Sequence, residues 1–187
     1  MKMSNLLTPL SDIEQALNKR ILKAVRRQET RRLILSDLAI LLVIGTALAL
    51  FLHFFSLRFV RGNEMFPEFS DGDLVLCYQE KEYQKNDAVF YTANGEQRFG
   101  RIVAKGGDEV DISESGALLV NGTAQTGEIW FDTEPPENWN GTLIVPEQSV
   151  FILGDYRKDA LDSRIFGCIP LDDVDDKVIA LFRHRKL

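Results

Sequence analysis

The chain has 187 residues, of which 45% are hydrophobic, and its formal net charge is −6. This length suits one domain of ordinary size plus a membrane-crossing segment, and it is short for two globular domains. Residues 1–32 hold eight Lys or Arg against three Asp or Glu, whereas residues 38–187 hold 14 against 24. The acidic portion argues against nucleic acid as a partner, because phosphate binding needs a cationic surface.

The only long apolar run covers residues 38–57 and contains no charged side chain apart from the weakly basic His53. At ~1.5 Å per residue, a helix of this length spans ~30 Å, the thickness of a hydrocarbon core. We therefore predict a transmembrane anchor over residues 36–57. The basic residues before it predict a cytoplasmic N-terminus and an external segment 58–187. A cleaved secretory signal is the alternative, since Ala47-Leu48-Ala49 mimics a cleavage site, but the apolar run continues beyond it.

Ahead of the anchor, apolar residues recur at helical intervals between Ile13 and Val25. This pattern predicts a cytoplasmic amphipathic helix within residues 1–35. Its basic residues would lie near anionic head groups of the bilayer, or they would only set the topology of the anchor. Both interpretations are open at this point.

Beyond Asp73, short β-rich runs replace helical periodicity, and turn signals such as Asn94-Gly95 and Asn121-Gly122 separate them. The pattern predicts a mainly antiparallel β domain over residues 58–187. Residues 111–148 are richer in polar, Gly and Pro residues and predict a smaller inserted lobe. The expected strands are Leu74–Tyr78, Ala88–Tyr91, Phe99–Val103, Val110–Ile112, Ala117–Val120, Leu143–Val145, Val150–Leu153 and Val178–Phe182.

Two cysteines, Cys77 and Cys168, fall in the external segment, where a disulfide could persist. Sequence spacing does not show whether their Cα atoms come within the ~4.4–6.8 Å that a bridge needs. Buried free thiols are the preferred interpretation, and a disulfide is the alternative. The two histidines, His53 and His184, do not group with the cysteines, so we predict no metal site and no cofactor.

Three segments, residues 59–73, 98–108 and 154–167, resemble in order the sequence boxes of the type I signal peptidase family. The first box keeps Met65 and Pro67 of a Ser-Met-x-Pro pattern. The resemblance covers most of the chain outside the N-terminal helix. It implies a signal-peptidase-like antiparallel β domain behind one transmembrane helix.

In that family the serine before the methionine is the nucleophile, and a lysine in the second box is its base. Here these positions hold Glu64 and Gly100, and Ala160 stands where a serine supports the lysine. Hydrolysis by a serine needs a nucleophile, a base and donors to the oxyanion. Lys105 is no replacement base, since it lies beyond the expected strand in a glycine-rich turn. We therefore predict that the chain is not an enzyme and has no catalytic residues.

The resemblance also implies an ion pair between Arg101 and Asp162 that holds two boxes together. The groove that receives an extended peptide in the family can still bind after the dyad is lost, because strand addition relies on backbone hydrogen bonds. The candidate residues of this peptide or partner groove are Glu64, Met65, Phe66, Pro67 and Asp155.

With serine and lysine both replaced, the chain resembles the signal peptidase-like accessory proteins of Gram-positive pilus assembly. The resemblance implies a membrane-anchored, chaperone-like factor for sortase-dependent pilus assembly in the cell membrane. Its partners would be pilin subunits, the pilus sortase or both, besides the lipid bilayer. One alternative is a signal peptidase that uses Glu64 and Asp155 as paired carboxylates. Another is a purely structural membrane protein.

Overall fold

The computed structural model describes residues 10–79, 82–126, 131–136, 139, 141–158 and 160–183. His184 and position 159 of the third box lie outside the described residues. The chain divides into two compact units, Met1–Leu52 and His53–Leu187.

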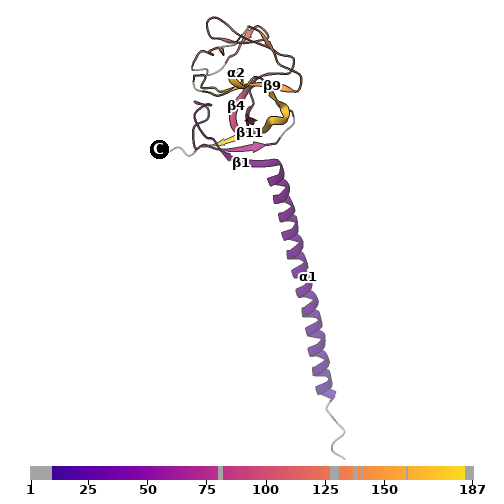
Figure 1. Ribbon diagram of the computed structural model, residues 1–187. Coiled ribbons are helices and arrows are strands. Elements are labelled where there is room, and N and C mark those ends of the chain that lie inside the picture. Colours follow the sequence, from indigo (N-terminus) through magenta and orange to yellow (C-terminus); the bar gives the residue numbers. More distant parts are fainter. Residues whose placement is uncertain are drawn as a thin grey trace, which may run out of the picture. The chain divides into compact units, whose positions relative to one another are not determined.

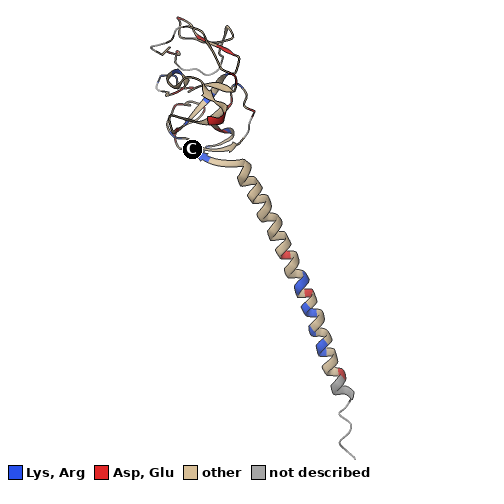
Figure 2. Cartoon of the chain, turned by 45° about the vertical axis from the view of Figure 1, so that its right-hand side comes forward, with Lys and Arg blue, Asp and Glu red and all other residues tan. Residues whose placement is uncertain are grey.

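Helix α1 runs from Leu10 to Phe54 without interruption (Figure 1). The two helices expected over residues 1–35 and 36–57 are therefore parts of one helix, because proline is absent between its ends and Gly45 is its one glycine. Charged side chains occupy the first part of α1, and its remainder is uncharged (Figure 2). The helix is long and apolar enough to cross a membrane.

The apolar anchor was predicted to end at Leu57, but the helix ends at Phe54 and strand β1 covers Phe55–Phe59. β1 pairs antiparallel with β2, Leu74–Tyr78. The chain leaves the helix at Phe54 because the side chains of residues 55–59 alternate between two faces, as in a strand. Arg58 forms an ion pair with Asp176 of another strand, whereas Leu57 and Phe59 on the opposite face are exposed.

The unit His53–Leu187 contains a seven-stranded antiparallel sheet in the order β1-β2-β11-β3-β4-β9-β10. This confirms the prediction of a mainly antiparallel β domain. A short helix, α2, covers Ser163–Phe166, and a 3-10 turn covers Leu171–Asp173. The remaining strands of this sheet are β3 (Ala88–Ala93), β4 (Glu96–Lys105), β9 (Ser149–Leu153), β10 (Ile169–Pro170) and β11 (Val174–Phe182).

The hairpin between β3 and β4 turns at Asn94-Gly95, as the sequence predicts. Both residues have positive φ, 52° and 77°, which a two-residue turn of this kind requires and which Asn and Gly tolerate. The turn sets the register, so that Tyr91 lies opposite Arg98 and Val89 lies opposite Gly100. This register brings β3 side chains to the neighbourhood of the second box.

A second, four-stranded antiparallel sheet starts at Glu109, two residues before the segment 111–148 that was expected to form a lobe, and ends at Ile144 within it. Its order is β7-β6-β5-β8. Buried residues of this sheet share one apolar cluster with Val103 and Phe151 of the first sheet, so the two sheets have a common core. The strands are β5 (Glu109–Ile112), β6 (Leu118–Val120), β7 (Thr123–Ala124) and β8 (Leu143–Ile144).

The two cysteines are free thiols in different parts of the core. Cys77 is buried beside Val75 and Phe90, and burial raises the pKa of its thiol to about 11. Cys168 packs against the cluster shared by the two sheets, and burial raises its pKa as well. Of the two alternatives left by the sequence, the structure contains the free thiols.

Candidate functional site

The loop between β1 and β2 carries the first box and is closed by backbone hydrogen bonds. The Val60 N–H donates to the Asp73 carbonyl at 2.8 Å, and the Gly72 N–H donates to the Val60 carbonyl at 2.9 Å. Met65 is only 1% exposed and packs in the core with Val60 and Phe69. Met65 therefore anchors the loop, and the prediction that it lines the groove is wrong.

Glu64 sits at the point where this loop meets the third box. The Tyr156 N–H donates to the Glu64 carbonyl at 2.9 Å. A Cβ at Gly154 would lie 2.8 Å from the same carbonyl and 2.5 Å from the Cβ of Ala160. Glycine at 154 thus allows the two loops to touch, and Glu64 and Ala160 both lie next to the position that a Cβ there would take.

Gly100 belongs to the same neighbourhood. A Cβ there would lie 3.3 Å from the Leu153 carbonyl, next to Gly154 in the chain, and 2.6 Å from Cγ2 of Ile152. The three positions that differ from the family's catalytic set, Glu64, Gly100 and Ala160, are therefore brought together around Leu153-Gly154.

The space beside Gly100 is filled, which the sequence alone did not reveal. A ring carbon of Tyr91 would lie 3.3 Å from a Cβ at Gly100, and Tyr91 is fully buried. Its hydroxyl donates to the Leu161 carbonyl at 3.4 Å. Counting the register outward from the Asn94-Gly95 turn would have placed Tyr91 diagonally beside Gly100, so the signal was present in the sequence.

The carboxyl of Glu64 is partly buried, and this burial raises its pKa above the ordinary value of 4.5. A backbone hydrogen bond from Leu161 and the positive charge of Arg98 act in the opposite direction, while the negative charge of Asp162 adds to the increase. The effect of burial on the pKa of Glu64 outweighs the opposing effects of Leu161 and Arg98. The folded chain consequently favours the neutral carboxyl more than the unfolded chain does.

This shift predicts a pH-dependent effect of Glu64→Gln on stability. Below pH 4.5 the carboxyl is neutral in both states, and its proton contributes stability that is lost as the pH rises through the raised folded pKa. Glutamine imitates the neutral form at every pH. The melting temperature of Glu64→Gln relative to the unchanged protein should therefore increase from pH 4.5 upward, as measured by circular dichroism in detergent micelles.

The control for this measurement is Glu114→Gln, which removes the same charge from an exposed turn. An advantage of Glu64→Gln that is largest in acid and disappears at neutral pH would contradict the assigned direction of the shift.

The expected ion pair between Arg101 and Asp162 is replaced by three others, two at Arg101 and one at Asp162. Arg101 donates through Nε and a terminal nitrogen to the Asp155 carboxylate at 2.8 and 2.6 Å. It also contacts Glu68 at 2.5 Å. Asp162 caps α2 and accepts from Arg164 at 2.9 Å and from the Gly154 N–H at 3.1 Å. The helix cap orients Asp162 toward Arg164, which leaves Asp155 to Arg101.

These pairs bear on the idea that Glu64 and Asp155 act as paired carboxylates. Such chemistry needs two carboxyl groups that share a proton. Both oxygens of Asp155 accept hydrogen bonds from Arg101. The Asp155 carboxylate is therefore occupied by Arg101 and does not share a proton with Glu64.

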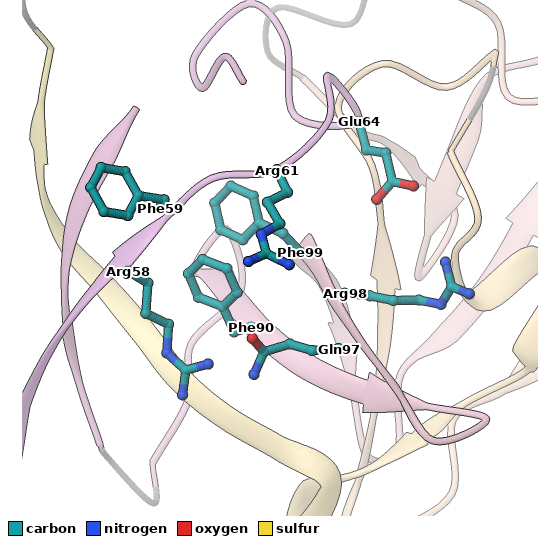
Figure 3. Close-up of a pocket in the computed structure, with 8 residues that line it drawn as sticks. All are labelled: Arg58, Phe59, Arg61, Glu64, Phe90, Gln97, Arg98 and Phe99. Atoms are coloured by element: carbon teal, nitrogen blue, oxygen red, sulfur yellow. The ribbon is translucent and has the colours of Figure 1, made fainter. Parts of the chain in front are cut away.

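Glu64 lies between two pockets, and we call the two together the Glu64 groove. Of the other predicted groove residues, Phe66 lines one pocket and Pro67 lines neither. The first pocket has a volume of about 370 Å³ and is cationic and aromatic (Figure 3). It is lined by Arg58, Phe59, Arg61, Glu64, Phe90, Gln97, Arg98 and Phe99. The second is lined by Asn63, Glu64, Phe66, Ser70 and Tyr156.

The sequence boxes did not single out Arg58 or Arg61, and Arg98 entered only as the start of the second box. Arg58 is on β1, hidden in the sequence at the end of the apolar run, and Arg98 follows the hairpin turn on β4. Within the described residues, His, Cys, Asp and Glu form no group that could hold a metal ion.

Comparison with known proteins places these features in a family. Residues 31–182 match the family described as signal peptidase, peptidase S26. The chain is 40% identical over 129 residues to the probable thylakoidal processing peptidase 2, chloroplastic, of Arabidopsis thaliana, with 62% of this chain and 34% of that protein covered. It is 26% identical over 150 residues to the probable signal peptidase I-1 of Synechocystis, with 72% and 75% covered. The chain thus spans about a third of the Arabidopsis relative.

Among solved structures, a crystal structure of a signal peptidase I from Enterococcus faecalis V583 is 25% identical. The similarity covers 53% of this chain and 97% of that one, with a TM-score of 0.43.

The prediction that the chain is not an enzyme is wrong on this evidence. The matching family is a peptidase family, and the relatives from Arabidopsis and Synechocystis are named peptidases. The prediction rested on the loss of one serine and one lysine, which removes one mechanism and does not exclude others. The partly buried Glu64 carboxyl is a titratable group at the position where the family has its serine.

Proposed function

Since the chain belongs to the signal peptidase family, peptidase S26, we propose that it acts on exported proteins at the membrane surface by binding an extended segment in the Glu64 groove. The observation that carries this proposal is the position of Glu64 between two pockets. Side chains two residues apart on an extended strand point the same way, ~6.5 Å apart. An extended peptide that crosses Glu64 can therefore place one side chain in each pocket.

In this proposal α1 is a single-pass anchor in the cell membrane. The Lys and Arg residues of its first part remain in the cytoplasm, and residues 58–187 lie outside. The apolar part of α1 ends at Phe54, and Arg58 and Phe59 of the first pocket follow within five residues.

The partners that we propose are pilin subunits or the pilus sortase. Glu64 and Gly100 in place of serine and lysine are the feature shared with the signal peptidase-like accessory proteins of pilus assembly. Binding of an extended pilin segment near the membrane would hold the subunit for sortase-dependent polymerisation. This is a chaperone-like role that needs only the groove and the anchor.

Photocrosslinking in a pilus-forming Gram-positive host tests the proposal. A photoreactive phenylalanine analogue replaces Phe59 or Phe66 of the two pockets, and Phe182, an exposed phenylalanine on β11 outside both pockets, is the matched control. Crosslinks to a pilin or the sortase are expected from positions 59 and 66 and not from position 182. Equal labelling from all three positions, or labelling of lipid alone, rejects the proposal.

A second candidate function, peptide hydrolysis, is favoured by the raised pKa of the partly buried Glu64. Here Glu64 accepts a proton from a water molecule whose oxygen attacks the scissile carbonyl carbon, and the proton then passes to the leaving amine as the C–N bond breaks. Glu64→Gln should reduce cleavage of a signal-peptide precursor by about 100-fold or more. If the unchanged protein shows no turnover at any pH, this candidate fails and the binding proposal stands.

A further inference from the structure

We propose that the first pocket of the Glu64 groove receives an acidic side chain, Asp or Glu, of the bound peptide. This inference rests on the proposed peptide-binding function and specifies the class of segment that is bound. It is carried by the arrangement of three arginines, Arg58, Arg61 and Arg98, around one pocket.

The three guanidinium groups reach the pocket from different directions. Arg58 comes from β1, Arg61 from the loop that follows, and Arg98 from β4. In Figure 3 the Arg61 guanidinium lies beside the rings of Phe90 and Phe99, whereas the Arg98 side chain points away from these rings, on the side of the Glu64 carboxylate. Basic groups therefore outnumber the one acidic group in the lining. This is the reverse of the balance in residues 38–187, which hold 14 Lys or Arg against 24 Asp or Glu.

The existing partners leave positive charge available. Arg58 forms an ion pair with Asp176, which offsets its charge. Arg98 pairs with Glu96 at 2.8 Å, but the Glu96 side chain is 73% exposed and can move away at little energetic cost. Arg61 is exposed and has no ion pair within the described part of the chain.

One atom of Arg98 is left without a hydrogen bond. Its Nε is buried and has no partner among the described residues. A buried donor without a partner is unfavourable, and a carboxylate is the acceptor that best matches the planar guanidinium. The Arg98 guanidinium lies over the ring of Phe166, so the exposed Arg61 is the direct contact for an incoming carboxylate, and the positive charge of Arg98 adds to the attraction.

The walls of the pocket favour a side chain with an apolar stem. Phe90 and Phe99 are almost fully buried and stack on each other with ring centroids 4.6 Å apart. They can contact the methylene groups of Asp or Glu while the arginines contact the carboxylate. A volume of about 370 Å³ has room for such a side chain and the adjoining backbone.

The second pocket predicts where the acidic residue does not bind. Its lining contains Glu64 and no basic residue. A carboxylate placed there would face Glu64 without a compensating charge. The recognised segment should therefore carry an acidic residue at the first pocket and an uncharged residue at the second.

Fluorescence anisotropy with labelled peptides tests the inference. The full chain is placed in nanodiscs of phosphatidylcholine, and the probes are extended peptides of Ala, Ser and Thr in which a single Glu is moved through the sequence. Each probe has a matched peptide with Gln in place of Glu. At one position the Glu peptide should bind about fivefold to tenfold more tightly than its Gln partner.

Arg61→Gln should abolish this preference, so that the Glu peptide and its Gln partner bind with equal affinity. Lys105→Gln, which removes one positive charge at the far end of β4 outside the pocket, should keep the preference. If Glu and Gln peptides bind equally to the unchanged protein, and Phe66→Ala weakens both, the proposed function holds and the inference is overturned. If no peptide binds, the proposed function fails and the inference fails with it.

The anionic head group of a lipid is the other source of negative charge near the anchor. The same titrations are therefore repeated in nanodiscs that contain phosphatidylglycerol. If Arg61→Gln alters only the interaction with phosphatidylglycerol, and the Glu preference is absent in phosphatidylcholine, the pocket binds lipid head groups and the inference is overturned.

Discussion

Replacing Asp162 by alanine is expected to lower the free energy of unfolding by about 3–5 kcal/mol, the range found when one partner of a buried ion pair is removed. Asp162 is 1% exposed and accepts hydrogen bonds from Arg164 and from the Gly154 N–H. The alanine variant leaves the guanidinium of Arg164, itself only 10% exposed, without its carboxylate. It also removes the cap of α2, since the Arg164 N–H donates to the same side chain.

Denaturant unfolding of the full chain in detergent micelles, followed by intrinsic fluorescence, measures this loss. Asp172→Ala is the control, because Asp172 is an exposed acid on the 3-10 turn of the same unit. A change below about 1 kcal/mol for Asp162→Ala, comparable to an exposed pair, would show that the pair is not important for stability. Gly154 contacts the loop of Glu64, so the variant should also weaken peptide binding in the groove.

Most strands of the unit His53–Leu187 were predictable because their signals are local. Asn94-Gly95 marks a two-residue turn, and counting outward from it gives the pairing of Val89 with Gly100. Strand β1 was missed for a physical reason. Phe55 and Leu57 are as apolar as the helix before them, and composition alone cannot separate the end of an anchor from a strand with an exposed apolar face.

The ion pairs of the third box were less predictable. Asp155, Arg157, Asp162 and Arg164 lie within ten residues, so spacing permits several pairings. The choice depends on the backbone, because Asp162 begins a helix and its carboxylate is directed toward Arg164. The boxes of the resembling family already group Glu64, Gly100 and Ala160, and the hairpin register places Tyr91 beside Gly100, but the crowding of Gly100 by Ile152 required the structure.

The last prediction concerns Arg157, a fully buried arginine with no carboxylate partner in an ion pair within the described residues. Its guanidinium donates to the Gly154 carbonyl at 2.9 Å, to the Gln125 side chain at 2.6 Å, and to the hydroxyl of Thr133. Gln125 and Thr133 belong to the segment that contains the second sheet, whereas Gly154 adjoins Glu64. Arg157 therefore connects this segment to the groove.

Two opposing effects determine the outcome of Arg157→Met. Burial lowers the pKa of Arg157 to about 10, which shows that its charge is unfavourable there, and methionine removes that charge. The three acceptors, however, lose their donor, and each unsatisfied buried acceptor costs about 1–3 kcal/mol. The lost hydrogen bonds outweigh the relieved desolvation, so we expect a net destabilisation of about 3 kcal/mol.

Hydrogen exchange separates this mechanism from a general loss of packing. The Thr133 N–H donates to the Gly116 carbonyl at 2.7 Å, and its protection should fall more than that of Val89 in the centre of the first sheet. Lys158→Met, an exposed neighbour, is the control and should change neither amide. Equal or greater stability of Arg157→Met would mean that the desolvation of the buried charge exceeds its three hydrogen bonds. The connection between the second sheet and the groove would then have to depend on the shared apolar core alone.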